Sequence, residues 1–215
     1  VVASSSLATC NTYVVARTLE TAKKVNHDVV TVTGGQHFTA TVEESLKEYS
    51  CIDYIVRDEG ELTFTDLAEN LKDKHALSGI QGISFRREGK VVHNPSRPLI
   101  ENLDDLPYPG YHLVERFVKK YHFAGMAGRD APFALIEGSR GCPHECTFCT
   151  QWRHWQGKWR LKSPRRIADE MEYCNRNFGS ELIWLTDDNL GFGGRLEEIC
   201  QLLIERGLAE EIIWF

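Results

Sequence analysis

Short runs of β-branched residues alternate along residues 1–93 with stretches in which apolar residues recur every three or four positions. The first pattern is typical of strands and the second of amphipathic helices. In residues 11–25, for example, Val15, Leu19 and Ala22 recur at this helical spacing. The pattern predicts strands at residues 1–5, 28–35 and 53–60, helices at 11–25, 41–49 (with Thr41 as N-cap) and 61–73, and a hairpin at 83–94.

A second alternation runs through residues 133–215. Ser163 and Pro164 are preferred residues for an N-cap and for the first position of a helix. Strands separated by helices favour right-handed crossovers and parallel sheets, so both segments are predicted to be α/β. The elements predicted here are strands at 133–138, 181–186 and 211–215, with helices at 164–177 and 195–207.

Residues 94–132 break both patterns. Their first part, residues 94–114, contains four of the seven prolines of the chain, and proline fixes φ and removes an N–H donor. Leu99, Leu103 and Leu106 occur among them, so we expect this stretch to lie against a surface. The predicted organisation is a doubly wound domain at 1–93, an interdomain linker at 94–132 and a second α/β domain at 133–215.

The charge of the chain and the length of its apolar runs limit the kinds of partner and location that we expect. The chain of 215 residues has a formal net charge of −6, which does not favour nucleic acid as a partner. Its apolar runs are far shorter than the roughly 20 residues of a membrane span, and no secretory signal is visible, so we expect a cytoplasmic location. Because the chain lacks an initiator Met and begins and ends in strand-like runs, we expect a fragment whose second domain leaves an apolar flank uncovered.

Three of the seven cysteines, Cys142, Cys146 and Cys149, fall within eight positions directly after the predicted strand at 133–138. The odd total and the clustering do not suggest a disulfide framework. Three thiolates on one loop can bind three irons of an iron–sulfur cube. The fourth iron is then left open for a ligand that is not a cysteine, as in reactive metal sites.

The alternative is a closed site, either structural zinc or a ferredoxin-type cluster, with a fourth ligand from elsewhere in the chain. The candidate ligands are Cys174, His144 and His154. Cys174 falls inside the predicted helix beside Met171, so it is predicted to pack as a small apolar residue. The two histidines are predicted to be ordinary loop residues.

The spacing C-x3-C-x2-C, with aromatic Phe148 directly before the last cysteine, resembles the signature of radical S-adenosylmethionine (SAM) enzymes. The resemblance implies a partial (β/α) TIM-like barrel and a [4Fe-4S] cluster held by Cys142, Cys146 and Cys149, with SAM on the open iron. It also implies reductive cleavage of SAM to a 5′-deoxyadenosyl radical. The three cysteines would then be the metal-binding and catalytic residues, and the cofactors would supply the difficult chemistry.

The segment "WLTDDN", residues 184–189, falls at the carboxyl end of the second predicted barrel strand, where barrel active sites lie. Many family members have a Gly-Gly-Glu segment there, whereas this chain has Asp187 and Asp188, as similar segments of the cobalamin-associated branch do. The resemblance implies SAM-facing roles for Phe148, Asp187 and Asp188. Alternatively, Asp188 and Asn189 only terminate the strand. Three tryptophans follow the cysteines: Trp152, Trp155 and Trp159. They either line the cavity of the active site and exclude water from it, or simply cover the open end of the barrel.

Two short segments end the first two predicted strands: "SSL" at residues 5–7 and "TGGQH" at residues 33–37. Small residues at such ends let a backbone approach a ligand in the crevice where open α/β sheets bind cofactors. Together they resemble the Ser-x-Leu and Gly-Gly motifs of cobalamin-binding domains, which line the slot for the nucleotide tail. The Asp-x-His-x-x-Gly motif of such domains is absent, and His37 is not expected to replace its histidine. The residues implied are Ser5, Leu7, Gly34 and Gly35.

The whole chain thus resembles the cobalamin-binding radical SAM family, near the magnesium-protoporphyrin monomethyl ester cyclase and methyltransferase group. The fold implied is a truncated Rossmann-like (flavodoxin-like) domain followed by the first part of a radical SAM barrel. The function implied is anaerobic methylation or oxidative cyclisation at an unactivated carbon of a small-molecule substrate, with cobalamin as second cofactor and a reductant such as ferredoxin or flavodoxin. Three alternatives remain: a first domain without a cofactor, a non-catalytic iron–sulfur or zinc module, and a methylthiotransferase-type enzyme.

Overall fold

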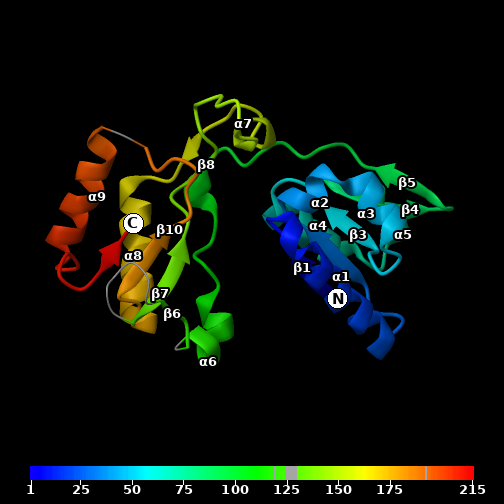
Figure 1. Cartoon of the computed structure of the whole chain (residues 1–215), viewed down its shortest axis with the longest axis horizontal. Coiled ribbons are helices and arrows are strands. Elements are labelled where there is room, and N and C mark those ends of the chain that lie inside the picture. Colours follow the sequence, from blue (N-terminus) through cyan, green and yellow to red (C-terminus); the bar gives the residue numbers. More distant parts are fainter. Residues whose placement is uncertain (119, 124–129, 192) are drawn as a thin grey trace. The chain divides into compact units, whose positions relative to one another are not determined.

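The computed structural model describes residues 1–118, 120–123, 130–191 and 193–215. The chain divides into two compact units, Val1–Ile100 and Glu101–Phe215, whose elements are labelled in Figure 1. Each unit has its own sheet with helices packed on it, as predicted for two α/β segments. Within the described ranges, no helix combines the length and the apolar character needed to cross a membrane.

The first unit is built on a five-stranded sheet in the order β1-β2-β3-β4-β5. Three strands run parallel: β1 (Val2–Ser5), β2 (Thr31–Gly34) and β3 (Tyr54–Val56). The expected hairpin is confirmed as antiparallel strands β4 (Ile83–Arg87) and β5 (Lys90–His93). Ser5 pairs with Gly34, and Gly34 with Val56, so the carboxyl ends of the parallel strands meet at one edge.

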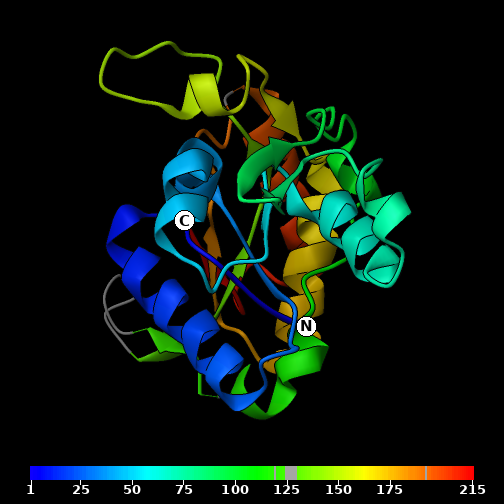
Figure 2. The ribbon, with the colours of Figure 1, turned by 90° about the vertical axis from the view of Figure 1, so that its right-hand side faces the viewer.

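Helices cover both faces of this sheet, which confirms the doubly wound prediction. Ile55 packs with Leu19 of the first helix on one face, and the next residue of the same strand, Val56, packs with Leu67 on the other. In Figure 2, the blue helices α1 to α3 lie on one side of the strands and the teal helices α4 and α5 on the other. The helices are η1 (Thr9–Asn11), α1 (Thr12–Val25), α2 (Gln36–Ala40), α3 (Val42–Glu48), α4 (Gly60–Asn70) and α5 (Lys74–Leu77).

Thr41 occupies the N-cap position of α3, as expected, but its side chain does not cap that helix. The short helix α2 directly precedes α3, and the Thr41 hydroxyl donates to the carbonyl oxygen of His37 in the last turn of α2 (2.9 Å). No amide of α3 bonds to this side chain. A threonine between two helices can satisfy the end of the first as well as the start of the second, and sequence pattern does not distinguish the two uses.

Gly34 and Gly35 allow the end of β2 to pack tightly against its neighbours. A Cβ atom at Gly34 would lie 2.8 Å from the carbonyl oxygen of Val56. Gly35 has φ +90°, and a Cβ atom there would lie 2.4 Å from the carbonyl oxygen of Ser6. Close approach of the chain to itself therefore accounts for both glycines, independently of any ligand.

Replacing Gly35 with alanine should destabilise the first unit by about 2–3 kcal/mol, because a strained φ is combined with a backbone clash. Gly89 in the hairpin turn is the matched control: it has φ +75°, but a Cβ atom there would have no described neighbour within 4 Å. Gly89→Ala should cost only about 1 kcal/mol, the backbone part alone. Hydrogen exchange of the β2 and β3 amides measures both free energies of opening. If the two substitutions destabilised the unit equally, the proposed clash between a Cβ atom at position 35 and the Ser6 carbonyl oxygen would be wrong.

The second unit contains a four-stranded sheet in the order β11-β10-β7-β6. The strands β7 (Ala131–Ile136), β10 (Leu182–Leu185) and β11 (Ile213–Trp214) run parallel, and β6 (His122–Phe123) is antiparallel to β7. Helices α8 (Pro164–Phe178) and α9 (Gly194–Glu205) pack on one face, next to each other. The predicted cap of α8 is confirmed, since Ser163 Oγ accepts from the Arg166 amide (3.1 Å).

Cys174 lies in the core between α8 and the sheet and is fully buried. Burial raises the pKa of its thiol to about 12, so it stays protonated and apolar at neutral pH. The prediction that Cys174 packs as a small apolar residue is confirmed.

The opposite face of this sheet is apolar and partly uncovered. Leu135, Trp184 and Ile213 are 42 %, 39 % and 44 % exposed, while their strand neighbours Ile136 and Ile183 are buried against the helices. Aromatic contacts run across this face, including Trp184 with Phe215 at a ring-centroid distance of 5.2 Å. The uncovered apolar flank expected from the sequence is therefore present.

The proline-rich stretch is divided between the two units. Asn94 donates to the carbonyl oxygens of Leu77 and Ile80 in the first unit (2.8 and 2.7 Å). In the second unit, the Tyr111 hydroxyl donates to the Leu135 carbonyl oxygen (2.9 Å) and accepts from its amide (2.7 Å). The helical turns here are η2 (Leu103–Asp105), η3 (Tyr111–Val114) and α6 (Glu115–Val118).

Candidate functional site

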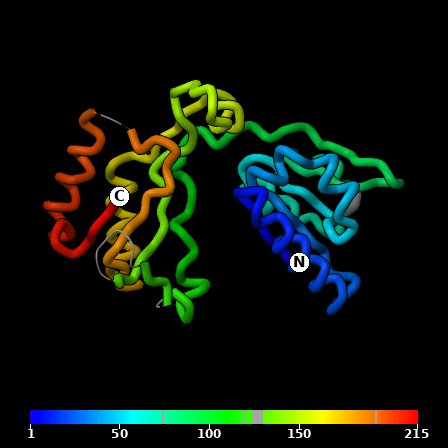
Figure 3. The backbone as a smooth tube through the Cα atoms, in the orientation of Figure 1, coloured from blue at the N-terminus to red at the C-terminus, as the bar shows by residue number. Residues whose placement is uncertain are grey.

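The three clustered cysteines lie on a long connection, residues 137–163, between β7 and α8. Its base is closed by the short antiparallel strands β8 (Ser139–Arg140) and β9 (Arg160–Leu161). The single helical turn α7 (Gln151–His154) follows the cysteines. Figures 1 and 3 show this cysteine loop, coloured yellow-green, beyond the carboxyl end of β7.

A glycine fixes the point at which the loop opens. Gly141 has φ +87°, and a Cβ atom there would lie 2.1 Å from the carbonyl oxygen of Lys158. The two limbs of the loop therefore touch immediately before Cys142, and no other residue fits at position 141 without moving the backbone. Cys142 starts from a defined position for this reason.

The loop after β10 holds both ends of the cysteine loop. The carboxylate of Asp187 accepts a hydrogen bond from the amide of Gly138 (3.1 Å). Arg195, in the first turn of α9, donates to the carbonyl oxygens of Gly138 (2.8 Å) and Lys162 (3.0 Å). Because Gly138 and Lys162 flank the loop, one guanidinium group joins its two ends. Sequence reasoning missed Gly138 and Arg195, since no local pattern marks either residue.

Asp187 is one of the residues predicted to face SAM. One of its carboxylate oxygens, Oδ2, accepts the Gly138 bond, and the other, Oδ1, bears on that prediction. Oδ1 is buried and makes no hydrogen bond to any residue that the structure describes. Burial raises the pKa of this carboxyl, and the neighbouring Ser139 hydroxyl and Gly138 amide partly offset the effect. The Ser139 proton is donated to the carbonyl oxygen of Asn189. An unsatisfied buried carboxylate oxygen is costly, and it points to a donor that belongs to a ligand or to water.

Asp188 and two of the tryptophans connect the cysteine loop to the same β10 loop. The indole N–H of Trp155 donates to Asp188 Oδ2 (2.9 Å), and that of Trp159 donates to the carbonyl oxygen of Asn189 (3.2 Å). These bonds give the tryptophans a positioning role that neither sequence interpretation included. Phe148, the third residue predicted to bind SAM, is 89 % exposed.

The cysteine thiols are free, with Cys142 and Cys149 half-buried and Cys146 exposed. In the described ranges, no three His, Cys, Asp or Glu side chains are grouped as a metal site. The donor set nevertheless fits an iron–sulfur cluster, because all three thiols are accessible on one loop and the Asn189 amide faces Cys142 Sγ (3.7 Å).

A buried group of charges lies below the loop. Glu170 of α8 is fully buried, and its carboxylate accepts from Lys162 Nζ (2.8 and 2.9 Å) and from Arg166 Nε (2.7 Å). Lys162 is the residue where the cysteine loop returns to the domain, so this ion pair fixes the exit of the loop. Glu170 falls among charged residues of an amphipathic helix, and its burial was not visible in the sequence.

In the first unit, the four residues predicted to bind cobalamin lie at the carboxyl edge of the parallel strands. Ser5 and Leu7 are exposed, Leu7 to 74 %. Gly34 is buried and Gly35 half-buried, and both serve the chain packing described above. His37 bonds Thr9 Oγ1 through Nδ1 (3.1 Å) and Thr41 Oγ1 through Nε2 (3.3 Å), so both ring nitrogens are engaged.

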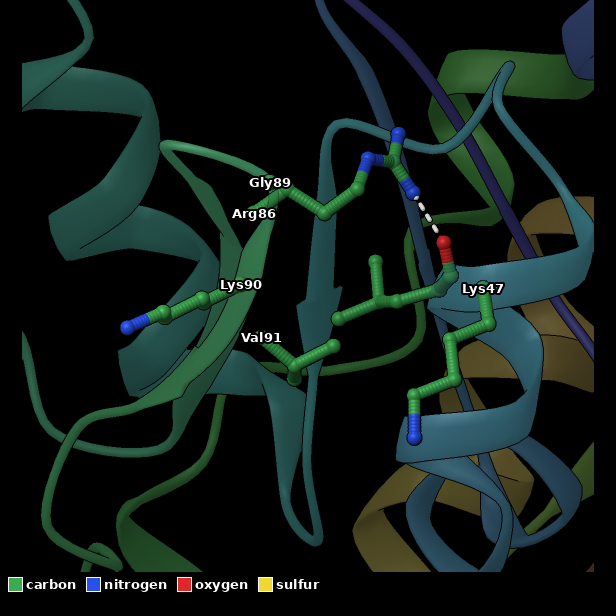
Figure 4. A pocket seen from close by; sticks show the side chains of 6 residues that line it. Lys47, Arg86, Gly89, Lys90 and Val91 are labelled. Atoms are coloured by element: carbon green, nitrogen blue, oxygen red, sulfur yellow. Dashed lines mark hydrogen bonds between the residues drawn. The ribbon is translucent and has the colours of Figure 1, made fainter.

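A groove of about 470 Å³ lies away from that edge, beside the amino end of β3 (Figure 4). Its guanidinium group, Arg86, donates to the carbonyl oxygens of Leu46, Tyr49, Ser50 and Ile52, which closes the end of α3. Lys47 pairs with Glu43 (2.9 Å). Two of the charged groups that line the groove are thus used by the fold, and this groove is a weaker site candidate.

Two families match the two units. Residues 1–68 match the family described as "B12 binding domain", and residues 136–214 match the "Radical SAM superfamily". The chain therefore combines a B12-binding domain with a radical SAM domain. The B12-binding domain contains the β1 and β2 ends with Ser5, Leu7 and the two glycines, and the radical SAM domain contains the cysteine loop.

Curated relatives that match most of this chain are themselves much longer. The chain is 37 % identical over 187 residues to an uncharacterized methyltransferase of Pyrococcus horikoshii, covering 87 % of this chain and 39 % of that protein. It is 35 % identical over 209 residues to the anaerobic magnesium-protoporphyrin IX monomethyl ester cyclase of Rubrivivax gelatinosus, covering 94 % and 36 %. The chain therefore spans less than two fifths of the length of either relative.

Solved structures support the fold. The cobalamin-dependent SAM radical enzyme OxsB, with aqua-cobalamin and SAM bound, superposes with a TM-score of 0.74 at 23 % identity, over 100 % of this chain and 30 % of that one. The prediction of a Rossmann-like cobalamin-binding domain followed by the first part of a radical SAM barrel is confirmed.

Proposed function

We propose that this chain carries the cofactor-binding parts of a radical SAM enzyme with cobalamin as its second cofactor. One observation carries the proposal: three accessible thiols in the spacing C-x3-C-x2-C lie on a loop at the carboxyl end of β7, within a radical SAM domain. In this proposal Cys142, Cys146 and Cys149 hold a [4Fe-4S] cluster and leave one iron for SAM. When bound, the cluster and cobalamin supply one-electron chemistry and a methyl carrier.

The chain's own residues position these groups and limit access of water. Asp187 is proposed to face SAM, because its buried Oδ1 makes no hydrogen bond to a described residue and a SAM amino group would supply a donor. Asp188 is held beside it by Trp155, and Phe148 is exposed at the cluster end of the loop. Trp155 and Trp159 close the gap between the cysteine loop and the β10 loop, which restricts water at that point.

Cobalamin is proposed to bind at the carboxyl edge of β1 and β2. Ser5 and Leu7 are exposed there, and Gly34 and Gly35 lie next to them at the end of β2. Open α/β sheets bind cofactors at this edge, where several strand ends and their loops converge. His37 is already bonded to Thr9 and Thr41, so it is not proposed as a ligand of cobalt.

The reaction class is methylation or oxidative cyclisation at an unactivated carbon of a small molecule. Relatives named as methyltransferases and as a cyclase support these two outcomes about equally. The proposal includes a one-electron donor such as ferredoxin or flavodoxin, and anaerobic operation in the cytoplasm. The anaerobic condition is in keeping with the name of the cyclase relatives.

Anaerobic reconstitution with iron, sulfide and hydroxocobalamin tests the proposal. We expect absorbance from both cluster and corrinoid, and release of 5′-deoxyadenosine from SAM under a strong reductant. SAM labelled in its methyl group then separates the two reaction classes, because methylation transfers the label to the substrate and cyclisation does not. A protein that binds iron or zinc but never cleaves SAM would instead be a non-catalytic module.

A further inference from the structure

Asn189 is the residue whose contacts the proposed function does not explain. It follows the two aspartates of the β10 loop, and it meets the cysteine loop through both its backbone and its side chain. Its carbonyl oxygen accepts from Ser139 Oγ (2.9 Å) and from Trp159 Nε1 (3.2 Å). Two donors from the cysteine loop therefore fix the position of this residue.

The orientation of its amide group follows from the hydrogen bonds. Asn189 Oδ1 accepts from the amide of Gly191 (3.0 Å). A backbone N–H can only donate, so the atom facing Gly191 must be the oxygen, and the NH₂ group must point the other way. It points at Cys142, with Nδ2 at 3.7 Å from Sγ.

Cys142 is the best-positioned of the three thiols. It is half-buried, and the contact between Gly141 and Lys158 fixes the backbone immediately before it. Both the donor and the sulfur are thus held in place before any cluster is present. An N–H···S bond to a cluster ligand stabilises the state with more negative charge on sulfur, which is the reduced cluster.

We propose that Asn189 is a positioning residue that donates an N–H···S hydrogen bond to Cys142 and thereby raises the reduction potential of the cluster. The inference rests on the proposed function, because it requires the cluster on Cys142. It adds a second role for the β10 loop: Asp187 faces SAM, and Asn189 adjusts how readily the cluster accepts the electron.

Asn189→Leu removes the donor at similar side-chain size. We expect the midpoint potential to become more negative, with the ratio of reduced to oxidised cluster at a fixed potential falling about tenfold, which corresponds to about 59 mV for one electron. A redox titration followed by the EPR signal of the reduced cluster measures this in the reconstituted protein. Asn177→Leu is the matched control, since Asn177 is exposed on α8 and donates to Tyr173 (2.9 Å).

Two further measurements keep the inference testable if Asn189→Leu folds poorly. Asn189→Asp retains the acceptor for Gly191 and removes the donor, so its potential should also become more negative. In the unmutated protein, selective ¹⁵N labelling of asparagine should give a nitrogen coupling in pulsed EPR of the reduced cluster. An unchanged potential in variants with full iron content, or the absence of this coupling, overturns the role of Asn189. A failure of the unmutated protein to assemble a cluster overturns the proposed function instead.

Discussion

Replacing Cys146 with alanine should abolish both cluster retention and reductive cleavage of SAM. Cys146 is exposed on the cysteine loop, outside the packed core, so the variant should fold normally. With two thiolates left, the cube loses one of its three protein bonds, and the site that orients SAM is lost with it. Iron and sulfide content, cluster absorbance and release of 5′-deoxyadenosine measure the effect, and we expect all of them to fall to background.

Cys200→Ala is the matched control for this variant. Cys200 is also exposed and free, but it lies on α9, outside the cysteine loop. The control should keep full iron content and full SAM cleavage. If the Cys146 variant retained both properties as well, the three-cysteine cluster would be wrong, and a site completed by other ligands would have to replace it.

Replacing Lys162 with methionine should cost the second unit roughly 3 kcal/mol of its free energy of unfolding. The change keeps the length of the side chain but removes the ammonium group from the fully buried carboxylate of Glu170. A buried ion pair that loses one partner is destabilised by about 3–5 kcal/mol, and Arg166 remains to neutralise part of the charge here. The loop exit at Lys162 should loosen at the same time.

Urea unfolding followed by tryptophan fluorescence measures this effect in the second unit alone, because all five tryptophans lie between residues 152 and 214. Arg176→Met is the control. It breaks the exposed ion pair with Glu211, in which the side chains are 48 % and 44 % exposed, and such pairs contribute less than about 1 kcal/mol. If both variants lost the same free energy of unfolding, the buried ion pair of Glu170 would stabilise the unit no more than an exposed pair does.

Much of the fold could be predicted from periodicity. The strand and helix order of both units, the hairpin at 83–94 and the cap of α8 all follow from patterns within a few residues. Thr41 was placed correctly at the start of α3, but the short helix α2 before it was not recognised, and the Thr41 side chain bonds to that helix instead. A five-residue helix has too few positions to show a period, and its neighbour Thr41 is an ordinary residue for either helix end.

The candidate site could be predicted only in part. The cysteine spacing marked the loop, and the aspartates marked the end of β10. The sequence did not reveal that Trp155 bonds Asp188, that Arg195 joins the two ends of the loop, or that Gly34 and Gly35 are required by the packing of their own strand. Each of these depends on a partner that no local pattern identifies.

By itself, the sequence indicated the candidate residues for the chemistry, which are three thiols on one loop and small residues at strand ends, and an alternation that favours parallel strands. Only the tertiary structure decided which side chains meet, as Asn189 and Cys142 do across 47 positions and Arg195 and Gly138 across 57. The physical reason is that periodicity reports the face on which a residue lies. The register of β7 against β10, which pairs Phe133 with Leu182, sets which loops come together.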